Sequence, residues 1–129
     1  MKQKTSKILK WLPSLIAAII ILLSASMKLA AVPELVEAYS RTGILEYMKL
    51  FAIAEILFVS MFIMNTTMRI GFFLLTAYYG GAMAVELSHG HMFVFPAGIL
   101  IIIWVGAFLR DKSLFKSFQE QKQVLAVRA

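Results

Sequence analysis

The chain has 129 residues, of which 60% are hydrophobic and 16% are charged, and its net charge is +6. Soluble domains average about 45–50% apolar and about 25% charged residues, so this composition indicates one membrane domain, residues 1–129. The absence of Cys excludes dithiol redox chemistry, thiolate metal sites and disulfides. The basic residues flank apolar runs and are not interleaved with aromatics on a polar face, which argues against nucleic acid as a partner.

The first predicted membrane span covers residues 11–28 and follows a lysine-rich N-terminus. A cleaved signal peptide is the alternative, but its apolar region would be only ~7–15 residues long, which is shorter than this run. The next segment begins at Pro33, a residue favoured at helix starts, and reaches Gly43, a residue favoured at helix ends. We expect a short helix on the membrane surface there, with an irregular loop as the alternative.

Three further spans are expected over residues 48–65, 69–87 and 92–109, and a basic tail, 110–129, is expected as a frayed helix. A bilayer core of ~30 Å requires about 20 helical residues, so the second span is short. The resulting fold class is all-α, an integral membrane four-helix bundle. We therefore expect the protein to be embedded in a lipid bilayer and to be located in the cell membrane.

Topology follows from the distribution of Lys and Arg over the loops and termini. The N-terminus, the turn at Arg69 and the tail carry four, one and five of these residues, ten in all, whereas the opposite side carries three. The positive-inside rule therefore predicts that both termini are cytoplasmic.

This topology places several polar residues of the spans towards the outer leaflet: Lys28 at the end of the first span, Glu55 in the second, and Tyr79 and Glu86 in the third. A charge in hydrocarbon costs ~2.5–3.5 kcal/mol on insertion scales, so we expect these groups to face one another in a small polar pocket. Three simpler interpretations stay open. In the first, the Lys28 side chain extends, or snorkels, to the lipid headgroups. In the second, Glu86 lies in water at the membrane interface. In the third, Lys28 and Glu55 form an ion pair that only holds two helices together.

Small residues precede Glu86 in the third span, namely Gly80, Gly81 and Ala82. Such residues allow helix backbones to approach closely, so they predict a helix-packing face. His89 and His91 follow in a loop, but two histidines at this spacing are a weak metal signal and no metal site is predicted.

The sequence resembles the DoxX-like proteins over nearly its whole length. The resemblance is carried by Lys28-Leu29, Pro33 to Gly43, Glu55, Gly80-Gly81-Ala82 and Trp104-Val105-Gly106-Ala107-Phe108-Leu109-Arg110-Asp111. It implies a four-helix membrane bundle; some members resemble subunits of thiosulfate:quinone oxidoreductases, some associate with oxidative-stress enzymes, and others assist receptor assembly. This chain departs from the pattern at Glu86, where relatives usually carry His, and at Ala25, where they carry Gly.

Three functions are consistent with these features. The first is a quinone- or redox-associated membrane component, with Lys28, Glu55 and Glu86 binding a polar headgroup or relaying protons. The second is a non-catalytic assembly or interaction protein, and the third is a small proton-coupled exporter. No intrinsic cofactor is expected, and quinone is the expected ligand for the first function. The expected protein partner is a membrane protein, a peripheral protein or a second copy of this chain. Whether the chain is an enzyme stays open.

Overall fold

The computed structural model describes residues 2–115, 123 and 125–127. All regular elements in these residues are helical, and no strand occurs among them, which confirms the predicted all-α class. The four long helices are α1 (Lys2–Leu29), α3 (Met48–Ile63), α4 (Met68–Ser88) and α5 (Val94–Arg110). The short elements are α2 (Pro33–Thr42), η1 (Leu45–Tyr47) and η2 (Lys112–Phe115). The predicted tail helix lies mostly outside the described residues.

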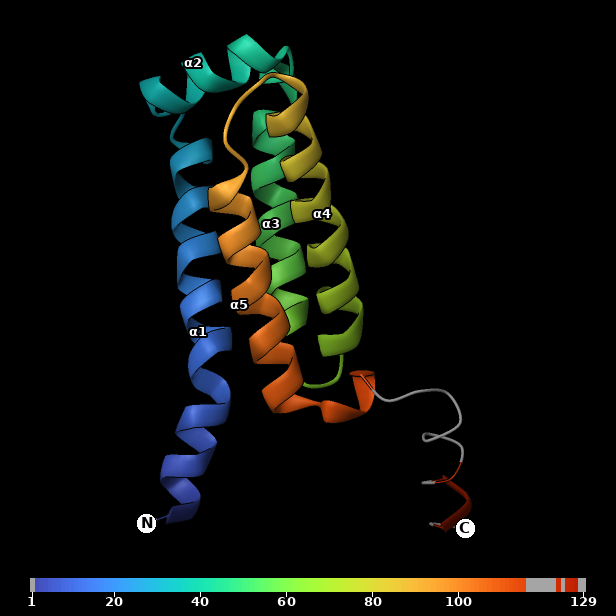
Figure 1. Cartoon of the computed structure of the whole chain (residues 1–129). Helices are drawn as coiled ribbons and strands as arrows, with labels where there is room; N and C mark the ends of the chain where they lie inside the picture. Colours follow the sequence, from blue (N-terminus) through green and yellow to red (C-terminus); the bar gives the residue numbers. More distant parts are fainter. Residues whose placement is uncertain (1, 116–122, 124, 128–129) are drawn as a thin grey trace.

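The four long helices lie side by side, and the direction of the chain alternates from one to the next (Figure 1). α1 packs against α3 and α5, and α4 packs against the same two helices. α2 lies across the end of this bundle at which α1 ends and α3 begins (Figure 1). We call this the α2 end, and the α2 end carries the candidate site.

The helix predicted between Pro33 and Gly43 is present as α2. Pro33 occupies its first turn, where the missing N–H has no intrahelical partner to lose. Gly43 ends the helix at φ 76°, a left-handed conformation that glycine adopts without the steric cost of a Cβ. The irregular-loop alternative is therefore wrong.

Two helices are long and apolar enough to cross a membrane, by length and composition: α1 over Thr5–Leu29 and α4 over Met68–Ser88. α5 is apolar but has 17 residues, and α3 has 16. At ~1.5 Å per residue, α3 reaches about 24 Å, less than the ~30 Å of a bilayer core. The predicted spans 48–65 and 92–109 thus correspond to helices shorter than a typical span.

The closest helix approaches occur at Gly71 and Gly106 and not at the glycines that the sequence singles out. A Cβ at Gly71 would overlap the backbone of Phe62, and a Cβ at Gly106 would lie 2.5 Å from the Oγ of Ser14. A Cβ at Gly80 or Gly81 would meet no heavy atom within 4 Å. No described helix therefore packs closely against Gly80 or Gly81, so their predicted packing role is not found among the described helices.

Arg110 joins three elements at the opposite end of the bundle. Its guanidinium donates to the carbonyl oxygens of Phe62 and Ile63, at 2.8 and 3.1 Å, and lies 3.9 Å from the ring centre of Trp11. The last carbonyls of a helix lack intrahelical partners and carry partial negative charge, so Arg110 both caps α3 and binds α1 to it.

Candidate functional site

The site is built on an ion pair between Lys28, in the last turn of α1, and Glu55, in the middle of α3. The Nζ of Lys28 lies 2.6 Å from Oε1 of Glu55. Lys28 is 6% exposed and Glu55 is 1% exposed. The structure therefore brings together the two charges that the sequence placed in one leaflet, and it does not show Lys28 reaching past the helix ends as the snorkelling interpretation requires.

Two consecutive tyrosines of α4 approach this pair with their hydroxyl groups. The Tyr79 hydroxyl donates to Oε1 of Glu55 at 3.5 Å, and Lys28 donates to the Tyr78 hydroxyl oxygen at 3.3 Å. Tyr79 is buried in the core, whereas Tyr78 is half-buried. Neighbouring side chains on a helix diverge by about 100°, so the two residues reach the pair from different directions.

Tyr39 of α2 brings a fourth element to Lys28. The ammonium lies 5.8 Å from the ring centres of both Tyr39 and Tyr78, within the range of a cation–π interaction. Burial raises the pKa of Tyr39, and the nearby Lys28 charge opposes this effect without cancelling it. The Tyr39 hydroxyl therefore stays protonated at neutral pH and can donate a hydrogen bond.

One oxygen of the buried carboxylate has no partner. Oε2 of Glu55 is inaccessible to solvent and accepts no hydrogen bond from any described residue. Leaving a buried polar atom unpaired is costly, and native proteins pair nearly all of them with protein, water or ligand. This oxygen is therefore an acceptor without a partner among the described residues, enclosed within the cluster and not part of a solvent-accessible surface.

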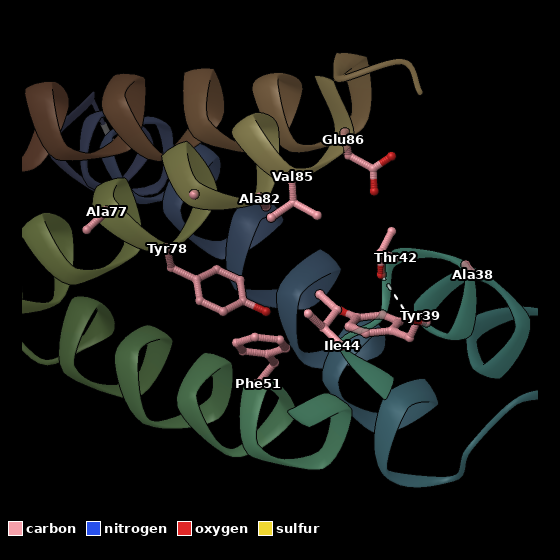
Figure 2. Close-up of a pocket in the computed structure, with 11 residues that line it drawn as sticks. Ala38, Tyr39, Thr42, Ile44, Phe51, Ala77, Tyr78, Ala82, Val85 and Glu86 are labelled. Carbon is pink, nitrogen blue, oxygen red and sulfur yellow. Dashed lines mark hydrogen bonds between the residues drawn. The ribbon is translucent and has the colours of Figure 1, made fainter. Parts of the chain in front are cut away.

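A cavity of about 360 Å³ lies beside the ion pair, between α4 on one side and α2, Ile44 and the start of α3 on the other. Figure 2 shows Tyr39, Phe51 and Tyr78 turned towards it, with Glu86 at its edge. Tyr78 belongs both to the wall of this cavity and to the Lys28 cluster. The full lining is Ala38, Tyr39, Thr42, Ile44, Phe51, Ala77, Tyr78, Gly81, Ala82, Val85 and Glu86.

Glu86 lies at the cavity and does not contact the Lys28–Glu55 pair. Its Oε2 is 3.3 Å from Nδ1 of His91, and its side chain is 37% exposed. The pocket predicted from the sequence is therefore divided: Lys28, Glu55 and Tyr79 form a buried cluster, and Glu86 borders the adjoining cavity. Among the described residues, no group of three or more His, Cys, Asp or Glu side chains could hold a metal ion.

Sequence reasoning missed Tyr39 and Tyr78 as site residues. Tyr78 is next to Tyr79, and Tyr39 lies within the segment from Pro33 to Gly43, but neither tyrosine is charged. Without knowing which face of α4 meets α3, the sequence could not distinguish Tyr78 from Tyr79. The position of α2 over the bundle end, which brings Tyr39 to Lys28, is a tertiary feature with no local sequence signal.

Comparison of the chain with protein-family models, curated proteins and solved structures gives no match. The resemblance to DoxX-like proteins thus rests on the short motifs quoted above and stays a prediction.

Proposed function

We propose that the chain is a multi-pass integral protein of the cell membrane in which α1, α3, α4 and α5 all span the bilayer. The support is the unusual exposure of apolar side chains. Only 28% of the apolar window of α1 and 22% of that of α4 is buried, whereas a core helix of a soluble protein would be mostly covered. Exposed leucine, isoleucine and phenylalanine side chains continue along α3 and α5. Such a surface suits lipid and not water.

In this arrangement both termini are cytoplasmic, and the α2 end faces outward. The support is the ten-to-three segregation of Lys and Arg across the four spans. α3 and α5 are short for a bilayer core, and a short helix is accommodated by local thinning of the bilayer at modest cost. The cavity then opens near the outer headgroups.

We further propose that this protein is a DoxX-like membrane component that binds the polar headgroup of a quinone. One observation carries this proposal: Tyr78 forms part of an apolar cavity wall, and its hydroxyl contacts a buried Lys28–Glu55 pair. Ligand pockets are typically apolar with a few placed polar groups, and an ionisable pair buried in a membrane protein marks a functional site by default.

The cluster offers both kinds of partner that a quinone and its reduced form require. Tyrosine hydroxyl groups and the Lys28 ammonium donate hydrogen bonds, which suits the carbonyl oxygens of a quinone. The unpaired Oε2 of Glu55 accepts hydrogen bonds, which suits the hydroxyl groups of a quinol. Electron transfer is assigned to a partner protein, because the chain has no Cys and no pair of buried histidines on separate helices.

The test is equilibrium binding of decylubiquinone to the detergent-solubilised protein, corrected for partition into empty micelles. Tyr78→Phe retains the ring and removes the hydroxyl, and a lost hydrogen bond of about 0.5–1.5 kcal/mol should raise the Kd about two- to tenfold. Tyr47→Phe is the matched control, because Tyr47 is exposed at the same end of the bundle. Equal affinity of wild type and Tyr78→Phe, or no binding at all, would overturn the proposal.

The assembly function is a second candidate, favoured by the open face at Gly80 and Gly81. Both glycines are exposed, and no described residue lies against them, so a helix of another membrane protein or of a second copy could approach there. If a second copy binds this face, Gly80→Leu should lower self-association measured by subunit counting in lipid nanodiscs. Gly98→Leu, at another unopposed glycine, should leave it unchanged.

A further inference from the structure

The charge around the cavity is negative. Glu86 is the one charged residue among the eleven that line the cavity. The nearest buried charges, Lys28 and Glu55, are 2.6 Å apart and neutralise each other. The only formal charge in the described lining of the cavity is therefore the negative charge of Glu86.

The Glu86 carboxylate is placed to act on a ligand in the cavity. Figure 2 shows it extending from α4 towards Thr42 of α2, on the opposite side of the cavity. One carboxylate oxygen lies 3.3 Å from His91, which is in the loop outside. His91 is itself 41% exposed, so water competes with this contact. The other carboxylate oxygen of Glu86 forms no ion pair with any described residue.

Aromatic rings form the wall beside this charge. The ring centre of Phe51 lies 6.3 Å from that of Tyr39 and 6.0 Å from that of Tyr78, with Phe51 and Tyr78 in an edge-to-face arrangement. The face of an aromatic ring is electronegative and attracts cations. Lys28 already shows this behaviour at the Tyr39 and Tyr78 rings.

We propose that this cavity binds organic cations that combine an aromatic or apolar body with an ammonium group, and that Glu86 is their counter-ion. The apolar body fills the space between the aromatic wall and the small residues of α4, Gly81 and Ala82. The ammonium lies at the rim, where Glu86 and the ring faces attract it and where it keeps part of its hydration. An anion of the same size is repelled by Glu86 and finds no basic residue in the lining.

This inference does not rest on quinone binding, although it concerns the same cavity. Quinone binding as proposed above depends on the hydroxyl of Tyr78 and on the buried pair. Cation binding depends on the carboxylate of Glu86 and on the ring of Phe51. The two proposals therefore fail separately, and each has variants that leave the other ligand unaffected.

The test is isothermal titration of phenyltrimethylammonium into the detergent-solubilised full-length protein, with empty micelles as the blank and benzenesulfonate as the anionic counterpart. The wild type should bind the cation and not the anion. Glu86→Gln should weaken cation binding about tenfold or more, because it removes the counter-ion while keeping the side-chain shape. Glu46→Gln, at an exposed carboxylate of the same end, should not change it.

Glu86→Gln should have the same melting temperature as the wild type, which excludes a fold defect as the cause of weaker binding. A second variant tests the aromatic wall independently. Phe51→Leu keeps an apolar side chain but removes the ring, and it too should weaken binding of phenyltrimethylammonium. The proposal is wrong if the wild type binds neither ion, if it binds both equally, or if Glu86→Gln retains wild-type affinity. Decylubiquinone binding without cation binding would leave the proposed function standing and remove this inference alone.

Discussion

At the scale of single residues, the burial of Lys28 and Glu55 requires explanation. Bringing two charges out of water costs several kcal/mol for each ion, and a hydrophobic pair of similar volume is often as stable or more stable. The pair is 2.6 Å apart and shares hydrogen bonds with Tyr78 and Tyr79, yet one carboxylate oxygen stays unpaired. An unpaired oxygen in such a pair is consistent with the ligand site proposed above, although the buried Nε of Arg110 at the other end of the bundle also lacks a hydrogen-bond partner among the described residues.

Glycines on α4 provide a residue-scale prediction about packing. Gly71→Ala should destabilise the protein by about 1–3 kcal/mol, because the added methyl overlaps the backbone of Phe62 and α3 must shift. Gly80→Ala should be neutral or stabilising by up to about 1 kcal/mol, because space is open and alanine favours the helix. Thermal unfolding in detergent measures both. Equal destabilisation by the two variants would mean that α4 is rotated relative to the described packing.

At the scale of the helices, the two ends of the bundle are held together differently. The α2 end is joined through Lys28, whose ammonium is close to side chains from α2, α3 and α4. The opposite end is joined through Arg110, which connects α5 to the end of α3 and to Trp11 of α1. The cavity described above adjoins the first cluster, and the second cluster caps α3.

Arg110 should therefore matter for stability and not for ligand binding. Arg110→Gln removes the guanidinium, which donates four hydrogen bonds within the described chain and stacks on Trp11. The two bonds to the carbonyl oxygens of Phe62 and Ile63 contribute about 1.5–3 kcal/mol each, so the variant should be less stable. Arg110→Lys should recover only part of the loss, because an ammonium lacks the planar fork of a guanidinium.

The control is Arg41→Gln, which breaks an exposed ion pair with Glu37 on α2 and should cost less than about 0.5 kcal/mol. Melting temperatures in one detergent compare the three variants. A loss of decylubiquinone affinity in Arg110→Gln at a temperature where it is fully folded would contradict the separation of the two ends.

At the scale of the whole molecule, the helical class was predictable because apolar runs of this length leave few alternatives. Pro33 and Gly43 marked α2 correctly, since each has a conformational preference that acts locally. The closeness of Lys28 and Glu55 followed from their depth in adjacent antiparallel helices. The division of the predicted pocket did not: Glu86 shares a face of α4 with Tyr79 but lies two turns, about 10 Å, further along the helix, and which of these depths meets Glu55 depends on packing. The contacts at Gly71 and Gly106 were missed for the same reason.

Topology supplies a prediction at this scale. Reporter fusions made after residue 40 and after residue 90 should both report an extracytoplasmic location, and a C-terminal fusion should report the cytoplasm, because Lys and Arg segregate ten to three. A cytoplasmic signal at residue 40 would place the cavity on the inner side. An extracytoplasmic C-terminus would show that one of the short helices, α3 or α5, does not span.

The most direct test of the account combines stability and binding in one set of variants, Lys28→Met, Glu55→Gln and the double variant. Each single variant should lose about 3–5 kcal/mol of unfolding free energy, because it leaves one buried charge unpaired, and the double variant should recover most of this loss. In the proposed function the pair serves the ligand and not the fold, so decylubiquinone binding should stay lost in the stable double variant. Additive destabilisation, or a double variant that binds decylubiquinone as tightly as the wild type, would contradict the account.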